Sequence, residues 1–239
     1  MKNIKVVIEY DGTEFCGWQY QPNERTVQGE VEHALKQLTS KNIRIIGAGR
    51  TDQGVHAFGQ VANFHTSSSL ELGKISKALN SLTGNDIYIK QIFKVNDDFH
   101  SRYSAQYKVY EYNIVLQPSP FKRRYNWYVR YPLDLSKMEK AKDYLAGQHN
   151  FKYFSAENDK DNTFCILHSI SLTEQNSRII IQLKGDRFLR KMARGIVGFL
   201  HDVGRGHYKP AQTQDVLDGK IRDLFFAPPQ GLFLVEVKY

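Results

Sequence analysis

The sequence predicts an α+β protein made of two ferredoxin-like domains, each with the element order β-α-β-β-α-β. Two observations support this fold class. Apolar runs typical of strands alternate with segments whose apolar residues recur at helical spacing. The same element order also occurs twice along the 239 residues, without visible sequence repetition. We therefore expect domains at 1–103 and 104–239, related by a pseudo-twofold axis, with their sheets joined around a central basic cleft.

The first predicted domain follows this order from the N-terminus. Residues 4–10 form an apolar run that ends at Asp11-Gly12, a dipeptide typical of turns, and they are predicted as a strand. A helix is expected to begin at Thr26-Val27-Gln28, because the apolar residues that follow recur at helical spacing. The other elements expected in this half are strands at 43–47, 60–65 and 87–95 and a helix at 72–82.

The second predicted domain repeats the order, with one strand and one helix added. Residues 108–116 alternate strictly, so Tyr110 and Tyr112 share one face of a strand. A long helix is expected from about residue 186 to residue 203. The other expected elements are a helix that Ser136 caps and Gly147 ends, a short helix at 213–217, and strands at 126–131, 164–173, 178–184 and 232–237.

The charge balance permits a nucleic-acid partner without requiring one, since the net charge is +8 and the pI is about 9.3. On the predicted long helix, four cationic residues lie at positions i, i+3, i+4 and i+7, opposite an apolar stripe. They are Arg187, Arg190, Lys191 and Arg194. This face is either a rail for RNA phosphates or an ordinary solvated surface. A shorter basic run, Lys122-Arg123-Arg124, is predicted to be a solvated turn.

Gly195 and Gly198 lie within the same predicted helix. Each costs about 1 kcal/mol relative to alanine in a helix interior. We expect close packing against another backbone to offset this penalty.

Several classes of protein are disfavoured by composition. No run of about 20 apolar residues is present, so no membrane span is expected. The N-terminus passes directly into strand-like sequence, unlike a signal peptide. Cys16 and Cys165 form no C-x-x-C motif, and the eight histidines show no metal-binding spacing. We expect a cytoplasmic protein with free thiols and no metal site.

A glycine-rich loop at residues 47–56 holds one carboxylate, Asp52, between Arg50 and Gly54. Such a loop can present a short side chain at a sheet edge, because glycine adopts backbone angles closed to other residues. A dinucleotide-binding turn would need glycine in place of Asp52, and a phosphate-binding loop would need lysine in place of Val55. Two interpretations remain, a functional carboxylate or an aspartate that caps its own turn.

The loop sequence Gly49-Arg50-Thr51-Asp52-Gln53-Gly54-Val55-His56 resembles the catalytic signature of the tRNA pseudouridine synthase A family. Further similar stretches occur in order along essentially the whole chain. They are Tyr10-Asp11-Gly12, Gly17-Trp18-Gln19, Asp97-Asp98-Phe99-His100, Ser104-Ala105 with Tyr110-Glu111-Tyr112, Phe188 with Met192-Ala193-Arg194 and Ile196-Val197-Gly198, and Ala227-Pro228 with Gly231-Leu232. The sequence departs from the family pattern at Lys108, at Arg190-Lys191 and at Gly195.

The resemblance implies an isomerase that converts uridine to pseudouridine in the anticodon stem-loop of tRNA, at positions 38, 39 and 40. Such enzymes break the N-glycosidic bond, rotate the base and rejoin it through C5, without a cofactor or a metal. Asp52 is the expected catalytic residue. It would act as the nucleophile at the ribose C1′, or as a base in a route through a glycal. The family also implies a homodimer that binds the anticodon arm.

Further site residues follow from the same resemblance. Arg194 is expected to pair with Asp52 and keep it ionised. Tyr110 is expected to lie against the uracil ring and to assist removal of the C5 proton. Arg50 is expected to fill the gap left by the flipped nucleotide. Additional substrate contacts are expected from Thr51, His56, Arg187, Arg190 and Lys191.

Two other functions compete with this interpretation. A non-catalytic RNA-binding module would carry an aromatic RNP1 strand, and the predicted strand at 60–65 lacks that pattern. A nucleotide-binding metabolic enzyme is disfavoured because both phosphate-binding motifs fail.

Overall fold

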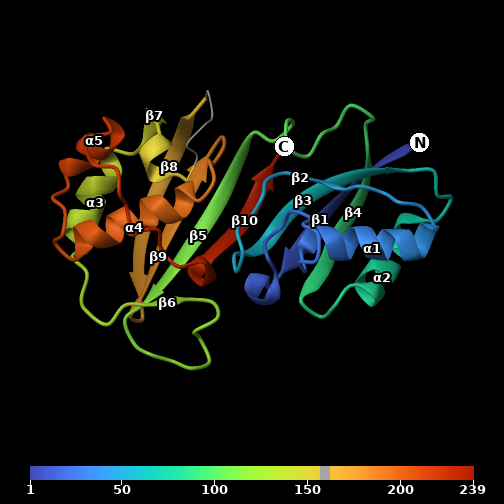
Figure 1. Cartoon of the computed structure of the whole chain (residues 1–239), viewed down its shortest axis with the longest axis horizontal. Coiled ribbons are helices and arrows are strands. Elements are labelled where there is room, and N and C mark those ends of the chain that lie inside the picture. Colours follow the sequence, from blue (N-terminus) through green and yellow to red (C-terminus); the bar gives the residue numbers. More distant parts are fainter. Residues whose placement is uncertain (157–161) are drawn as a thin grey trace. The chain divides into compact units, whose positions relative to one another are not determined.

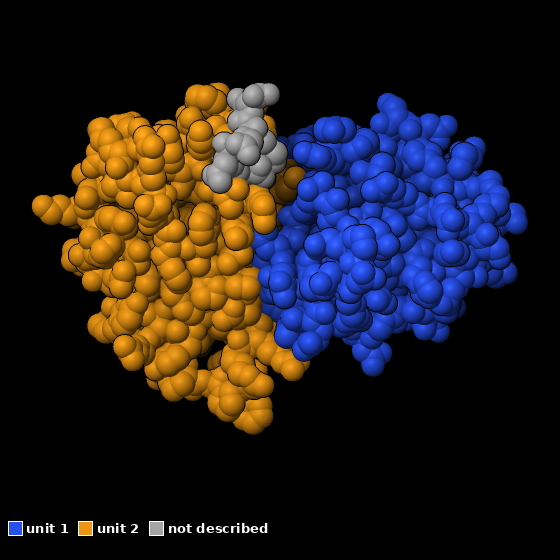
Figure 2. Space-filling model, viewed as in Figure 1, with its two compact units in different colours: residues 1–106, 233–239 blue, residues 107–232 orange. Residues whose placement is uncertain are grey.

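The computed structural model describes residues 1–156 and 162–239, and it confirms the predicted α+β class. Two compact units divide the chain (Figure 2). Unit 1 comprises Met1–Gln106 and Phe233–Tyr239, and unit 2 comprises Tyr107–Leu232. The predicted domain boundary between residues 103 and 104 stays a prediction. The compact units group residues 104–106 and the last seven residues with the N-terminal half. No described helix is long and apolar enough to cross a membrane.

Unit 1 contains an antiparallel sheet in which β1 (Lys2–Tyr10) lies between β4 (Ile87–Val95) and β3 (His56–Thr66). The short strand β2 (Ile46–Gly47) pairs with β3 on its other side. The order β4-β1-β3-β2 is that of a ferredoxin-like unit. The strand β10 (Leu232–Lys238) pairs with β3 in parallel, at His56 and Ala57.

Two helices of unit 1, α1 (Val27–Thr39) and α2 (Leu72–Leu82), lie side by side against this sheet (Figure 1). Alternate residues of β1, Ile4, Val6 and Ile8, are 0% exposed and form the core. Helix α1 begins where the sequence predicts, because the Thr26 side chain accepts a hydrogen bond from the Gly29 N–H.

The strand predicted at 43–47 is shorter in the structure and comprises only β2. Ile43 and Ile45 are buried, as an apolar run should be, but their backbone does not continue the ladder. The Ile45 N–H donates to the Glu32 carboxylate over 2.9 Å, and the Ile45 carbonyl accepts from Gln28. Side chains of α1 therefore take the hydrogen bonds that a longer strand would have made.

In unit 2, four antiparallel strands follow the order β5-β9-β8-β7. They are β5 (Tyr107–Val115), β7 (Gly147–Asn150), β8 (Phe164–Gln175) and β9 (Arg178–Gly185). The two-residue strand β6 (Trp127–Tyr128) runs parallel to β5. The predicted hairpin is confirmed as β8 and β9, joined through Asn176 and Ser177, which both have positive φ.

Three helices complete unit 2: α3 (Leu135–Asp143), α4 (Met192–Gly204) and α5 (Gln212–Leu217). Helices α3 and α4 pack against each other (Figure 1). The cap of α3 is Asp134 and not Ser136, because the Asp134 carboxylate accepts from the Lys137 N–H over 3.0 Å. The helix also ends at Asp143, before the predicted Gly147.

Helix α4 begins at Met192, so the prediction of a helix from about residue 186 was wrong. The segment leaving β9 is held as a loop. Asp186 Oδ1 accepts from the backbone N–H of Ile166 and of Arg187, and the Arg190 carbonyl accepts from the Ala156 N–H. Lys191 then adopts a left-handed conformation, with φ of 60°, which breaks helical continuity.

Candidate active site

Asp52 lies in unit 1, in the loop between β2 and β3, and its side chain is half-buried. The loop turns back on itself after Asp52. The Val55 N–H donates to the Asp52 carbonyl over 3.2 Å, and Gly54 has φ of +75°. A left-handed angle of this kind favours glycine, so Gly54 is part of the turn that presents the carboxylate.

The chain segment after β1 supports this loop from one side. The Trp18 N–H donates to the Thr51 carbonyl over 3.1 Å, and the Tyr10 hydroxyl lies 2.8 Å from the Thr51 hydroxyl. On the other side, the Gln60 amide donates to the Gly49 carbonyl over 2.9 Å. The backbone is therefore fixed both before and after Arg50 and Asp52.

Two glycines in the supporting segment allow it to lie directly against the loop. A Cβ atom on Gly12 would overlap the Val55 carbonyl oxygen. One on Gly17, which has φ of +88°, would lie 2.6 Å from the Thr51 carbonyl oxygen. Both distances are too short for a real side chain, so these positions require glycine for steric reasons.

Tyr10 places a neutral hydroxyl beneath the loop. Burial raises the pKa of Tyr10 to about 12, although hydrogen bonds with Thr51 and Gln60 lower it in part. The phenol therefore stays protonated at neutral pH and can hold Thr51 without adding negative charge close to Asp52.

The other predicted site residues of unit 1 have different surroundings. Arg50 is exposed. Thr51 is 7% exposed and its hydroxyl faces Tyr10. His56 is only 1% exposed; its Nδ1 accepts from the Gly12 N–H over 3.0 Å, and its ring stacks on Phe233. These contacts give His56 a supporting position behind the loop.

Tyr110 and Arg194 lie in unit 2. Tyr110, on β5, is 6% exposed and meets the edge of Phe188 with a ring-centre distance of 4.8 Å. Tyr112, two residues along the same strand face, is fully buried and donates from its hydroxyl to the Pro228 carbonyl over 2.7 Å. Burial raises the pKa of Tyr112, and the positive charge of Arg194 offsets part of that effect.

Arg194 is held at two points by the chain segment that precedes β10. Its Nε donates to the Ala227 carbonyl over 2.7 Å, and the Ala227 N–H donates to the Arg194 carbonyl over 3.0 Å. The guanidinium is half-buried in the first turn of α4. This two-point contact restricts the directions in which its remaining N–H groups can point.

The glycines of α4 occur where two backbones approach the helix, as the sequence predicts. A Cβ atom on Gly195 would overlap the Phe154 carbonyl oxygen, and one on Gly198 would overlap the Phe225 carbonyl oxygen. The approach of residue 225 to the helix brings Ala227 within reach of Arg194. Gly198 therefore contributes to the position of the guanidinium.

The predicted four-residue cationic rail is not a single helix face, because only Arg194 lies on α4. Arg187 is half-buried and donates to the Asn162 carbonyl over 3.3 Å. Arg190 is exposed, and the Lys191 ammonium lies 5.6 Å from the centre of the Phe226 ring. The three preceding residues therefore present their charges from a loop, and their spacing in sequence says nothing about a common direction.

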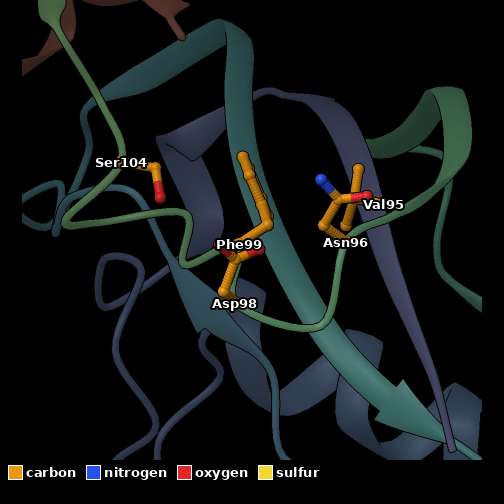
Figure 3. A pocket seen from close by; sticks show the side chains of 5 residues that line it. All are labelled: Val95, Asn96, Asp98, Phe99 and Ser104. Atoms are coloured by element: carbon orange, nitrogen blue, oxygen red, sulfur yellow. The ribbon is translucent and has the colours of Figure 1, made fainter.

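A shallow pocket of about 350 Å³ in unit 1 is lined by Val95, Asn96, Asp98, Phe99 and Ser104 (Figure 3). The lining residues do not include Asp52 or any other predicted site residue. The pocket lies at the end of β4 and on the segment that follows it. Hydrogen bonds connect this segment to the sheet. The Asn3 amide donates to the carbonyls of Asn96 and Phe99, each over 2.9 Å.

Within residues 1–156 and 162–239, no group of three or more histidine, cysteine, aspartate or glutamate side chains could hold a metal ion. Of the predicted catalytic residues, Asp52 lies in unit 1, whereas Tyr110 and Arg194 lie in unit 2.

Sequence reasoning did not identify the residues that support these groups. Gly12, Gly17 and Ala227 lie in stretches that resemble the family, but no local pattern predicts their partners. The same holds for Tyr10, which ends the first predicted strand and begins one of these stretches. Their supporting role could not be predicted because each of these residues contacts a segment at least 30 positions away in the chain.

Comparison of this chain with known proteins finds a matching family model and full-length relatives. A family model described as tRNA pseudouridine synthase matches residues 6–104 and 141–239. A protein named tRNA pseudouridine synthase A from Thermoanaerobacter sp. (strain X514) is 41% identical over 244 residues, and the match covers 100% of each chain. The protein of the same name from Caldicellulosiruptor bescii is 43% identical, again with 100% of each chain covered.

A structural likeness to one solved structure is weak. A chain from "Crystal Structure of a Cbf5-Nop10-Gar1 Complex" matches with a TM-score of 0.37 and 9% identity, covering 96% of this chain and 57% of that one. Such a score is too low to inform the fold. The family model and the full-length relatives are sufficient without it, and they show that this chain belongs to the tRNA pseudouridine synthase family.

Proposed function

We propose that the protein converts uridine to pseudouridine in the anticodon stem-loop of tRNA, at positions 38, 39 and 40, with Asp52 as its catalytic residue. The observation that carries this proposal is the Asp52 loop, which has the sequence signature of the family. The loop is supported on one side by Trp18 and on the other by Gln60. A carboxylate on such a loop is preorganised for one task, because its backbone need not rearrange during the reaction.

The chemistry requires one well-placed carboxylate. Cleavage of the bond between N1 and C1′ builds positive charge on the ribose, and an ionised Asp52 either captures C1′ covalently or removes a proton from C2′ to give a glycal. The freed uracil then rotates and its C5 bonds to C1′. This step breaks the ester bond between Asp52 and C1′ in the first route, and in the second route the protonated Asp52 returns the proton to C2′; C5 then loses its own proton. Deuterium at C2′ would slow only the route through the glycal, so isotope substitution distinguishes the two.

Arg194 and Tyr110 complete the proposed site. Pairing with the Arg194 guanidinium would keep Asp52 ionised while the bound RNA excludes water. The contacts of Arg194 with Ala227 support this role, because they orient the guanidinium before any substrate binds. Tyr110 is proposed to lie against the uracil and to assist loss of the C5 proton. Its ring packs edge-on against Phe188, and aromatic rings are suited to pack against a base.

Access to C1′ requires the uridine to leave the RNA stack. We assign the exposed Arg50 to the vacated space, where its planar guanidinium would stack between neighbouring bases. Additional phosphate contacts are assigned to Arg187, Arg190 and Lys191. Thr51 and His56 are assigned an indirect role in substrate binding, because both are buried and support the loop from within. A homodimer that holds the anticodon arm is part of this proposal.

Mapping pseudouridine in tRNA after incubation with the purified protein tests reaction and target together. New pseudouridine at positions 38, 39 or 40 of a transcript that contains uridine there is the expected result. If pseudouridine formed only at other positions, the proposed target would be wrong but the proposed activity would stand. A lack of any pseudouridine, with tRNA still bound, would favour a non-catalytic RNA-binding module instead.

A further inference from the structure

The loop between β5 and β6 combines positive charge with exposed aromatic rings. Between residues 112 and 133 the chain has four cationic residues and no aspartate or glutamate. Three of the four are consecutive, Lys122, Arg123 and Arg124, and they follow Phe121 and precede Tyr125. We call residues 116–126 the basic loop.

Hydrogen bonds within the basic loop define the fold of its tip. The Lys122 N–H donates to the Ser119 carbonyl over 3.2 Å, and the Tyr125 N–H donates to the Lys122 carbonyl over 3.1 Å. The Arg123 guanidinium donates to the Pro120 carbonyl over 2.6 Å, and the Asn126 amide donates to the Lys122 carbonyl over 2.9 Å. These two consecutive turns present a defined surface and not a loose connection.

The base of the basic loop is anchored to unit 2. Strand β6 pairs with the end of β5, and the Val129 N–H donates to the Val115 carbonyl over 3.0 Å. The Trp127 ring lies 4.3 Å from the His201 ring and 5.6 Å from Phe225. The aromatic contacts at the base contrast with the tip, where all residues from 121 to 125 are exposed.

Phe121 is 91% exposed and Tyr125 is 41% exposed. Exposed aromatic rings interleaved with lysine and arginine are the composition of surfaces that bind RNA. The cations contact phosphates there, and an aromatic ring stacks on an unpaired base. This arrangement fits the tip better than the solvated turn that the sequence predicts, because a solvated turn does not require a phenylalanine with nearly its whole side chain in water.

The basic loop is separate from the proposed uridine site. It begins after Val115, five residues beyond Tyr110 on β5. At about 3.3 Å per residue, this part of the strand spans roughly 17 Å. The base of the basic loop is therefore well separated from Tyr110 along the strand.

We infer that the basic loop is a second tRNA-binding site, in which Lys122, Arg123 and Arg124 contact backbone phosphates and Phe121 stacks on an unpaired base. This inference rests on the proposed function, because it takes tRNA as the ligand. A basic loop with an exposed ring could also bind an anionic membrane surface. The single highly exposed phenylalanine offers little apolar area for insertion into lipid, and this favours RNA.

The decisive experiment compares the triple variant K122Q/R123Q/R124Q with a matched control, K74Q/K77Q/K94Q. The control removes three exposed cations from α2 and β4. For the basic-loop variant we expect KM for tRNA to rise by about ten-fold or more while kcat stays unchanged. The slope of log Kd against log salt should fall by about 2 to 3, since each lost phosphate contact accounts for about 0.7 to 0.9. The control should keep the wild-type slope.

Phe121→Ala separates stacking from charge. It should weaken tRNA binding about five-fold or more, because stacking one base on an aromatic ring contributes about 1–3 kcal/mol, and it should leave the salt slope unchanged. Circular dichroism of every variant establishes that it is folded.

The inference is overturned if the basic-loop variant matches its control in KM and salt slope while the wild type forms pseudouridine. It is also overturned if the wild type binds phosphatidylcholine vesicles only when they contain phosphatidylserine, the basic-loop variant loses that binding, and KM for tRNA is unaffected. A wild type that forms no pseudouridine contradicts the proposed function itself. In that case, comparing the tRNA affinity of the two triple variants still shows whether the basic loop binds tRNA.

Discussion

At Asp52, the hydrogen bonds that fix the loop use backbone atoms of neighbouring residues. Thr51 and Gly49 are held through their carbonyls, and Asp52 accepts from Val55 through its own carbonyl. The carboxylate can therefore be altered without removing these supports. A substitution that keeps its shape should affect chemistry and leave folding largely intact.

Asp52→Asn should reduce pseudouridine formation by at least about a hundred-fold, because a neutral amide neither attacks C1′ nor stabilises its positive charge. The backbone hydrogen bonds of the loop remain, so the variant should stay folded. Product mapping measures the loss of activity, and urea unfolding shows whether the variant is folded. Asp98→Asn, in the pocket of Figure 3, is the matched control and should keep full activity. Undiminished product from Asp52→Asn would exclude Asp52 as the catalytic carboxylate.

Arg194→Ala should lose both activity and stability. Ala227 is fully buried, and without Arg194 its carbonyl loses a charged donor, which costs about 1–3 kcal/mol. Urea unfolding measures the loss of stability, and pseudouridine formation measures the proposed effect on Asp52. The exposed Arg44→Ala serves as a control for charge alone, and it should change stability little. Wild-type rates in Arg194→Ala would leave the proposed ion pair without support.

At the scale of elements, helix α4 shows why its glycines are tolerated. Gly195 and Gly198 lose conformational entropy in a helix, yet they permit contact with the carbonyls of Phe154 and Phe225. The helix also begins six residues later than its apolar periodicity predicts, because Asp186 and Lys191 end the preceding segment as a loop. Periodicity indicates which residues can be buried on one side, but it does not report which backbone hydrogen bonds are made.

Two glycine-to-alanine substitutions test this explanation. Gly195→Ala should destabilise the protein by about 1–3 kcal/mol or more, because the new methyl group overlaps the Phe154 carbonyl oxygen and the backbone must move. Gly73→Ala on α2 meets nothing within 4 Å and should stabilise by up to about 1 kcal/mol through helix propensity. Opposite signs in urea unfolding are expected. A Gly195→Ala variant as stable as Gly73→Ala would contradict the close-packing argument.

For the whole molecule, both units contain tyrosines whose hydroxyls are removed from water. Burial raises the pKa of Tyr10 and Tyr239 in unit 1 and of Tyr112 in unit 2. The folded chain therefore holds these phenolic protons more tightly than the unfolded chain does. Stability from this source is fully present below the unfolded pKa and is lost as pH rises through the folded pKa.

We expect the free energy of unfolding to fall between pH 10 and pH 12, and the shift of Tyr10 from 10.0 to about 12 contributes about 3 kcal/mol to that fall. Urea unfolding across this pH range measures it. Tyr10→Phe should show a shallower decline, because its ring has no proton to lose, and the exposed Tyr88→Phe is the matched control. A decline in Tyr10→Phe as steep as in the wild type would show that Tyr10 does not carry this effect.

The sequence by itself determined the family, through the residues around Asp52, and the elements with clear local periodicity, such as α1, α2 and β5. Tertiary structure alone decided where α4 begins, how short β2 is, and which residues support the site. The physical reason is that these features depend on contacts between distant segments. Gly12 and Gly17 shape the Asp52 loop through backbone contact, and Arg194 is held by the carbonyl of Ala227. A contact with the backbone of a distant segment does not depend on which side chains that segment carries, so it produces no recognisable pattern in the sequence.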